Sequence, residues 1–161
     1  KGNFYVVKDV AVLNIAKQEQ SSPNDKTHAM QTGDFASAWI DHGRAPKQAG
    51  YEYVVYIQPS NKEINRLLKK DEYEVLRKDN AAHVVKDLQT GITGYVCFEE
   101  YRGDGLLREA TAETIVMERT TPEGEVVMSV CTPDLGITEK SYTTRQESRP
   151  IEKEVLLDGA W

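Results

Sequence analysis

The stretch "TIVMERTTPEGEVVMSV", residues 114–130, decides the fold. Two runs rich in β-branched and other apolar residues flank "TTPEG", whose proline and glycine are the residues that tight turns favour. In the second run Val126, Met128 and Val130 alternate, so they fall on one face of an extended strand. We therefore predict an antiparallel β-hairpin at this position.

The same pattern recurs along the chain. "KDLQTGITGYVCF" places Thr90-Gly91 between strands expected near 83–88 and 92–98. Further strands are expected in "NFYVVKDVAVLNI", "DFASAWI", "YEYVVYI", "YEVLRK" and "PIEKEVLL", with polar loops at 18–32, 99–110 and 133–150. The expected fold class is all-β, built from antiparallel β-sandwich segments.

One segment has a helical pattern, "SNKEINRLLKK". Ser60 is a suitable N-cap with Glu63 three residues later, and Ile64, Leu67 and Leu68 form an apolar stripe. We expect a short connecting helix near 61–70. Because this helix interrupts the strands, we place a domain boundary there, between 1–70 and 71–161.

Composition excludes several functions. The 161 residues are 39% hydrophobic and 29% charged, with a formal net charge of −6, which disfavours general binding to nucleic acid. The longest apolar runs, such as "VVYI", are too short to span a membrane.

The two cysteines, Cys97 and Cys131, are expected either as buried free thiols or as a disulfide between neighbouring strands. The three histidines show no metal-ligand spacing, so we expect no metal and no cofactor.

Asp41-His42 is the first candidate for chemistry, because a carboxylate beside an imidazole suggests an acid–base pair. Adjacent residues in a strand or turn usually point apart, however, and no nucleophile accompanies them. The favoured interpretation is structural: both side chains hydrogen-bond a loop closed by Gly43 and Pro46.

Loop 99–110 is the second candidate. Arg102 and Arg108 lie near glycines there and are candidates for binding a sulfate or carboxylate of a substrate, although an ordinary hairpin tip is the favoured interpretation. The tetrapeptide "RGDG" at 102–105 contains a cell-adhesion tripeptide, which we interpret as a chance occurrence in a mobile turn. Trp39, Trp161 and several tyrosines are either core residues or platforms for sugar rings, with core packing favoured.

Asp158-Gly159 is a hairpin-turn dipeptide close to the last residue, so we expect a partner strand beyond Trp161 in a longer protein.

"FASAWIDHGRAPKQAGYEYVVYIQPS", residues 35–60, closely resembles a segment of polysaccharide lyase family eight, the chondroitin, hyaluronan and xanthan lyases. The likeness continues through "YEVLRKDNAAHVVKDLQTGITGYVCFE" and "IVMERTTPEGEVVMSVCTPDLGI", and looks most like the chondroitin sulfate ABC lyases. The residues that match the family motif are Trp39, Asp41, His42, Gly43, Pro46, Tyr51, Tyr53 and Pro59.

The resemblance implies that residues 1–70 end a large β-sandwich and residues 71–161 form most of a smaller C-terminal one, truncated at its end. The family acts by β-elimination, and the resemblance implies a parent enzyme that cleaves chondroitin or dermatan sulfate. The catalytic residues of the family lie in an upstream helical domain of the same polypeptide, so none is expected here. It also implies a sulfated glycosaminoglycan as ligand and a periplasmic or secreted location, and leaves a divalent cation in the parent enzyme open.

The expected function is therefore that of the C-terminal β region of a glycosaminoglycan-degrading lyase, inactive alone, which supports the catalytic domain or the substrate cleft. The alternative is a non-catalytic carbohydrate-binding module. An exposed aromatic pair beside Arg or Lys would favour the module.

Overall fold

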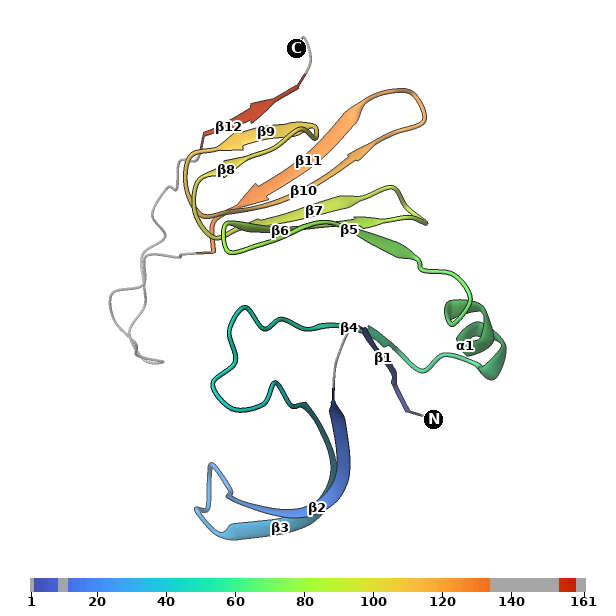
Figure 1. Cartoon of the computed structure of the whole chain (residues 1–161), viewed down its shortest axis with the longest axis vertical. Coiled ribbons are helices and arrows are strands. Elements are labelled where there is room, and N and C mark those ends of the chain that lie inside the picture. The colour runs from blue at the N-terminus through green and yellow to red at the C-terminus, as the bar shows by residue number, and fades with distance from the viewer. Residues whose placement is uncertain (1, 9–11, 134–153, 159–161) are drawn as a thin grey trace. The chain divides into compact units, whose positions relative to one another are not determined.

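The computed structural model describes residues 2–8, 12–133 and 154–158. The chain divides into two compact units, Lys1–Arg66 and Leu67–Trp161 (Figure 1). The division falls inside the segment where the sequence places a boundary. Assigning each unit to a named domain of a larger enzyme stays a prediction.

The first unit contains two antiparallel pairs of strands. Strand β1 (Phe4–Lys8) pairs with β4 (Glu52–Tyr56), and β2 (Leu13–Pro23) pairs with β3 (Met30–Ile40). The β2–β3 hairpin is long and curved (Figure 1). The predicted loop at 18–32 is therefore wrong, because both strands continue through it and only residues 24–29 form the turn. Asn24 closes this turn by accepting hydrogen bonds from the backbone N–H groups of Lys26 and Thr27.

Helix α1 (Asn61–Leu67) begins after the predicted capping box. The Ser60 backbone N–H donates to Glu63 Oε2 over 2.8 Å, and the Glu63 N–H donates back to Ser60 Oγ over 3.3 Å. The hydrogen bonds from Ser60 lower the pKa of the Glu63 carboxyl. The helix is shorter than expected. It ends at Leu67, which is buried, whereas Leu68 is exposed and does not extend the apolar stripe.

The second unit has two antiparallel sheets (Figure 1). A five-stranded sheet has the order β11-β10-β7-β6-β5, and a three-stranded sheet has the order β12-β9-β8. Their strands are β5 (Tyr73–Lys78), β6 (Ala82–Asp87), β7 (Thr93–Cys97), β8 (Tyr101–Arg102), β9 (Leu107–Ala110), β10 (Thr114–Thr120), β11 (Val126–Cys131) and β12 (Val155–Leu157).

This arrangement confirms the all-β, antiparallel fold class with one short helix. The hairpin that residues 114–130 predict is β10–β11, and Val126, Met128 and Val130 do share a face. Loop 99–110 is not all loop, because β8 and β9 form a hairpin within it. Most of the predicted loop 133–150, and also Gly159 and Trp161, lie outside the described residues.

The core of the second unit lies between its two sheets. Side chains of both sheets contribute, and the buried set is Ala82, Val84, Tyr95, Cys97, Tyr101, Leu107, Ala110 and Val116. Met128 of β11, with Val155 and Leu157 of β12, packs against this set. A core drawn from two sheets is what a β-sandwich requires.

A β-bulge in β5 sets the direction of one important side chain. Val75 pairs with Val85, but Arg77 pairs with Val84, so Leu76 has no partner across the ladder. Directly paired residues share a face, and Val84 is buried in the core. The bulge therefore turns Arg77 toward the inner face, whereas uninterrupted pairing would place it on the outer face with Val75.

The two cysteines are free thiols, so the disulfide alternative is wrong. Cys97 is buried in the core, as expected, but Cys131 is exposed at the end of the edge strand β11. Burial raises the pKa of the Cys97 thiol. Among the described residues, no helix is long and apolar enough to cross a membrane.

We expect only Cys131 to react with a water-soluble thiol reagent in the folded protein, because Cys97 is excluded from solvent and its thiol is held protonated. Colorimetric thiol titration should give one fast equivalent, and a second only in denaturant. The Cys131→Ser variant should lose the fast equivalent. Equal fast reaction of both thiols would contradict the packing described for β7.

Candidate functional site

The family-motif loop after β3 is a structural corner. The backbone N–H of Gly43 donates to Asp41 Oδ1 over 2.7 Å, and Gly43 has the left-handed φ of 74° that favours glycine. The backbone N–H of Asp41 donates to the carbonyl oxygen of Val12 over 3.0 Å. His42 is exposed, with no hydrogen-bond or ionic partner in the described part of the chain. Asp41 thus stabilises a turn as predicted, but His42 does not bond to the loop, and the two do not form an acid–base pair.

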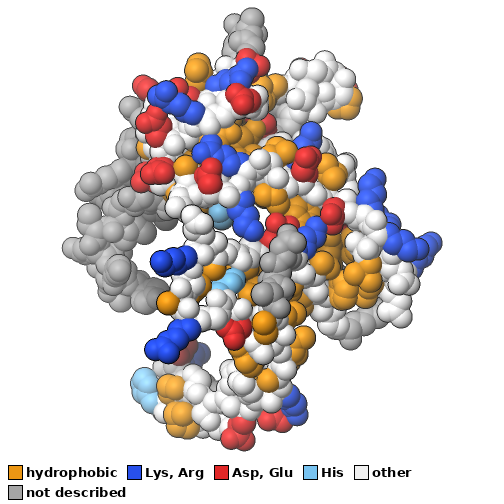
Figure 2. All heavy atoms as spheres, viewed as in Figure 1, with side chains coloured by type: hydrophobic (Ala, Val, Ile, Leu, Met, Phe, Trp, Pro, Cys, Tyr) orange, Lys and Arg blue, Asp and Glu red, His pale blue; other side chains and the backbone are white. Residues whose placement is uncertain are grey.

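The aromatic residues of the same motif are exposed rather than buried. Tyr51 and Tyr53 stack at 6.1 Å between ring centroids with an interplanar angle of 21°. Their exposed fractions are 57% and 53%, and that of Trp39 is 46%. Core packing, the favoured interpretation for the aromatics, is therefore wrong for these three residues but correct for Tyr95 and Tyr101. Hydrophobic side chains reach the molecular surface in several places in Figure 2.

Arg102 and Arg108, the predicted substrate-binding cations, both have acidic partners. Arg102 Nη2 lies 2.7 Å from Glu100 and 3.7 Å from Glu109. Arg108 lies 3.1 Å from Asp158 and 3.7 Å from Asp104. A sulfate that binds here must compete with these carboxylates. Substrate binding by this hairpin stays a prediction, and the contacts favour the hairpin-tip alternative.

The glycines of "RGDG" have a packing role. A Cβ on Gly103 would collide with the hydroxyl of Tyr101, and a Cβ on Gly105 would lie 2.9 Å from the hydroxyl of Tyr95. The loop between β8 and β9 therefore passes directly over the two buried tyrosines. Close packing, rather than mobility, accounts for the glycines in this tetrapeptide.

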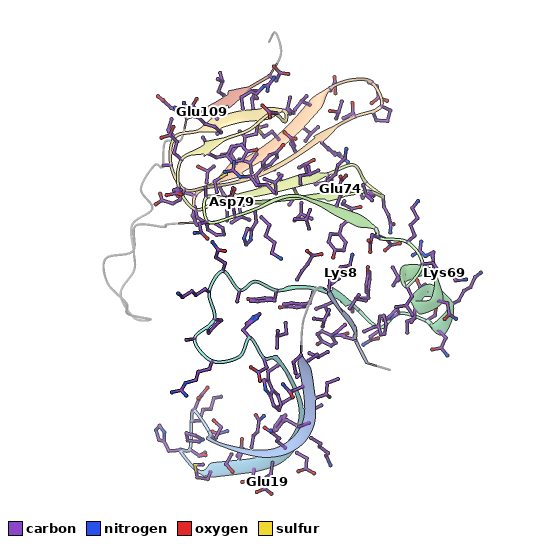
Figure 3. All side chains as sticks on the ribbon, in the orientation of Figure 1. Lys8, Glu19, Lys69, Glu74, Asp79 and Glu109 are labelled. Carbon is purple, nitrogen blue, oxygen red and sulfur yellow. The ribbon has the colours of Figure 1, made fainter. Side chains whose placement is uncertain are left out.

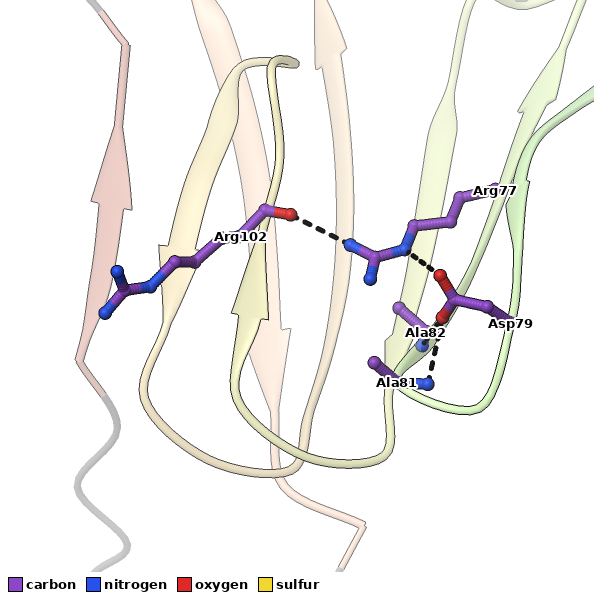
Figure 4. A network of polar contacts seen from close by, with 5 residues as sticks. All are labelled: Arg77, Asp79, Ala81, Ala82 and Arg102. Atoms are coloured by element: carbon purple, nitrogen blue, oxygen red, sulfur yellow. Dashed lines mark hydrogen bonds and ion pairs between the residues drawn. The ribbon is translucent and has the colours of Figure 1, made fainter.

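Arg77 joins the two sheets of the second unit (Figure 4). Its Nη1 donates to the backbone carbonyl of Arg102 in β8 over 2.8 Å, and its guanidinium lies 5.2 Å from the ring centroid of Tyr101. Its Nε donates to Asp79 Oδ2 over 2.6 Å, and Asp79 Oδ1 accepts from the N–H groups of Ala81 and Ala82. The bond from Arg77 lowers the pKa of Asp79, and the same bond raises the pKa of Arg77.

Glu118 carries a buried carboxylate in the second unit. Its side chain is 7% exposed, Oε1 accepts a 2.7 Å hydrogen bond from the hydroxyl of Tyr95, and Oε2 is buried without a partner. Burial raises the pKa of Glu118, while the hydrogen bond from Tyr95 and the charge of Lys86 lower it by less. Burial, together with the bond to Glu118, raises the pKa of Tyr95.

The sequence interpretation missed Arg77 and Glu118. Glu118 carries a readable signal, because it follows Thr114 and Val116 at the two-residue period of a buried face. Arg77 carries none, because its direction depends on the bulge. The described residues contain no cluster of three or more His, Cys, Asp or Glu side chains that could hold a metal ion.

Comparisons with known proteins give a consistent result. No protein-family model matches the chain. The chain is 30% identical to the chondroitin sulfate ABC endolyase of Proteus vulgaris over 99% of its own length and 16% of that enzyme. It is 36% identical to the chondroitin sulfate ABC exolyase of Bacteroides thetaiotaomicron over 65% of its own length and 11% of that enzyme. The resemblance to polysaccharide lyase family eight is confirmed.

Solved lyases contain the same fold. A mutant of the chondroitin AC lyase from Streptomyces coelicolor A3 matches 80% of the chain with a TM-score of 0.64 and 23% identity, over 18% of that enzyme. A Paenibacillus xanthan lyase matches 74% of the chain with a TM-score of 0.60 and 20% identity, over 12% of that enzyme. The chain thus spans less than a fifth of the length of these lyases.

We expect Asp41→Ala to lower the free energy of unfolding of the chain by about 1 kcal/mol, because the turn loses the hydrogen bond to Gly43. Asp41→Asn keeps an acceptor oxygen and should lose less. His42→Ala should change it by less than about 0.5 kcal/mol, as exposed side chains usually do. Urea unfolding measures all three, and a larger loss in His42→Ala would contradict the turn described here.

The buried carboxylate makes stability depend on pH. Because the folded pKa of Glu118 is raised above the ordinary value of 4.5 for a glutamate, its contribution to stability is most favourable below pH 4.5 and is lost as the pH rises through the folded pKa. Glu118→Gln, which carries no charge, should flatten this dependence in urea unfolding at acidic and neutral pH. Tyr95→Phe should destabilise by about 1–3 kcal/mol at neutral pH and by less in acid. Parallel pH profiles for the wild-type and Glu118→Gln proteins would show that Glu118 is not the responsible group.

Proposed function

We propose that this chain is the C-terminal β region of a glycosaminoglycan-degrading polysaccharide lyase and supports its catalytic domain and substrate cleft. The observation that carries the proposal is the alignment of almost the whole chain with a small part of the chondroitin sulfate ABC endolyase. The turn role of Asp41 and the pairing of Arg102 and Arg108 with carboxylates agree with a supporting rather than a catalytic role.

An exposed apolar sheet face agrees with this role. Residues that face away from the core of the five-stranded sheet include Val85, Val96 and Met117, with exposed fractions of 38%, 38% and 54%. A contiguous apolar face of this kind usually marks an interaction surface. In the proposed parent enzyme, the remaining polypeptide is its partner.

The proposed reaction of the parent enzyme is β-elimination on chondroitin or dermatan sulfate. Polar groups neutralise the uronate carboxylate and so acidify the proton at C5. A base removes that proton, the C4–O bond breaks, an acid protonates the leaving oxygen, and a double bond forms between C4 and C5. In this proposal these groups belong to the upstream helical domain. An enzyme with this substrate would be secreted or periplasmic.

A carbohydrate-binding module is the second candidate. The stacked and exposed pair Tyr51 and Tyr53 favours it, because amphipathic aromatic rings are common in binding surfaces. In this case the chain alone would hold glycan but would not cleave it.

We expect the purified chain to form no unsaturated uronate from chondroitin sulfate, as followed by ultraviolet absorbance. A hybrid in which the chain replaces the matching segment of the Proteus vulgaris endolyase should form it, whereas that endolyase without the segment should not. Circular dichroism and thermal unfolding would establish that the hybrid is folded. Elimination by the chain alone, or a folded but inactive hybrid, would contradict the proposed supporting role.

A further inference from the structure

The two faces of the β2–β3 hairpin differ sharply in charge. On one face Gln18 pairs with Phe35, Gln20 with Gly33, and Asn14 with Trp39, and every residue of β2 and β3 on this face is uncharged. On the other face Lys17 forms a 2.6 Å ion pair with Asp34, beside Glu19. Figure 3 shows Glu19 on the convex, outer side of the curved hairpin. The uncharged face is therefore the concave one.

This concave face is hollowed toward the hairpin turn. The hollow has a volume of about 800 Å³, within the range of ligand sites. Five of the ten residues that line it lie on the concave face: Gln20, Ser22, Gln31, Gly33 and Phe35. The turn contributes Asn24 and Asp25, and Asp25 is the one lining residue that ionises. The lining lacks a cation for a sulfate and a large apolar wall for a hydrophobic ligand.

Phe35 lies along this face. A Cβ placed on Gly33 would come within 3.2 Å of Phe35 Cε2, so the ring leans over the glycine instead of standing away from the sheet. The ring is 54% exposed. Trp39, four residues along the same face and 46% exposed, lies about 13 Å away at the usual rise of a strand. The two aromatic surfaces are spaced so that a short oligosaccharide can span them.

Amide groups between and beside the rings have unused hydrogen-bonding capacity. Gln20 Nε2 donates to Ser37 Oγ over 2.9 Å, which leaves Gln20 Oε1 and the Ser37 hydroxyl proton available. Within the described part of the chain, the side chains of Gln18 and Gln31 have no hydrogen-bond partner. Such groups accept and donate equally well, as the hydroxyl and acetamido groups of a sugar require. We call the set the amide strip; it comprises Gln18, Gln20, Gln31, Phe35, Ser37 and Trp39.

We propose that the amide strip binds the N-acetylhexosamine rings of a glycan chain through their uncharged groups, with the aromatic residues under the pyranose faces and the amides on the hydroxyl and acetamido groups. The choice of this ligand rests on the proposed function, because every second sugar of a chondroitin chain is an N-acetylhexosamine. The residues that line this hollow offer a sulfate no cationic contact, so recognition is by shape and hydrogen bonds. This differs from an Arg102 and Arg108 site, which binds through charge.

The test is calorimetric titration of the chain with an unsulfated chondroitin tetrasaccharide and with its sulfated form, each at low and high salt. We expect saturable binding with affinities that agree within about twofold across the four conditions, because screening has little effect on uncharged contacts. Phe35→Ala should weaken binding about tenfold. Gly33→Val, which displaces the ring without removing it, should weaken it similarly. Lys17→Gln, on the convex face, and the double variant Arg102→Ala/Arg108→Ala should bind as the wild type.

Each of the other outcomes contradicts glycan binding by the amide strip. Loss of binding in the arginine double variant but not in Phe35→Ala would locate the glycan at the β8–β9 hairpin. Affinity that needs sulfation or falls steeply with salt would also reject an uncharged site. Absence of binding in a chain whose unfolding is unchanged would show that this face has no glycan ligand. None of these results changes the outcome expected for the hybrid enzyme. The titration therefore tests the amide strip, and the hybrid enzyme tests the proposed function, independently of each other.

Discussion

The edge-to-face contact of Tyr95 with Tyr101 is the interaction on which the second unit depends. The ring centroids are 5.8 Å apart with an interplanar angle of 77°, and one tyrosine comes from each sheet. Two large rings between the sheets leave no room for a side chain at the two loop positions that pass closest to them. Gly103 and Gly105 occupy these positions. The hydroxyl of one ring then needs a buried acceptor, which is Glu118, and the face of the other carries the Arg77 guanidinium.

The polar groups in this core lower its stability but define a single geometry for its side chains. A carboxylate oxygen buried without a partner costs free energy, and a hydrophobic residue at 118 would avoid that cost. The polar contacts, however, each specify one geometry. The bond from Arg77 to the Arg102 carbonyl fixes how the β8–β9 hairpin lies on the larger sheet. The bond from Tyr95 to Glu118 joins β7 to β10 within the larger sheet and fixes the direction of the Tyr95 ring.

The sequence predicted correctly the turns and the helix cap that depend on residues close together in the chain. The Pro and Gly of "TTPEG", the capping box at Ser60 and Glu63, and the Asp41 turn all formed as expected, because each depends on residues a few positions apart. The extension of β2 and β3 was missed because "QEQSSP" contains polar residues on both faces, and only pairing with the partner strand makes it a strand. The acidic partners of Arg102 and Arg108 include Asp158, which is far away in sequence. The pairing of Arg108 with Asp158 depends on how β12 joins β9, and no local pattern contains that information.

The bulge in β5 has a consequence for the comparison of related chains. Leu76 is the extra residue, and the strand on either side of it keeps its own pairing with β6. Removal of this single residue would leave Val75 opposite Val85 and the arginine opposite Val84, so the guanidinium would still lie over the tyrosine ring. Insertions and deletions are therefore best tolerated at this point of the strand. A relative that is one residue shorter here can retain the hydrogen bond from the arginine of β5 to the backbone of β8. An alignment without a gap at this position would match the arginine of that relative to the wrong residue.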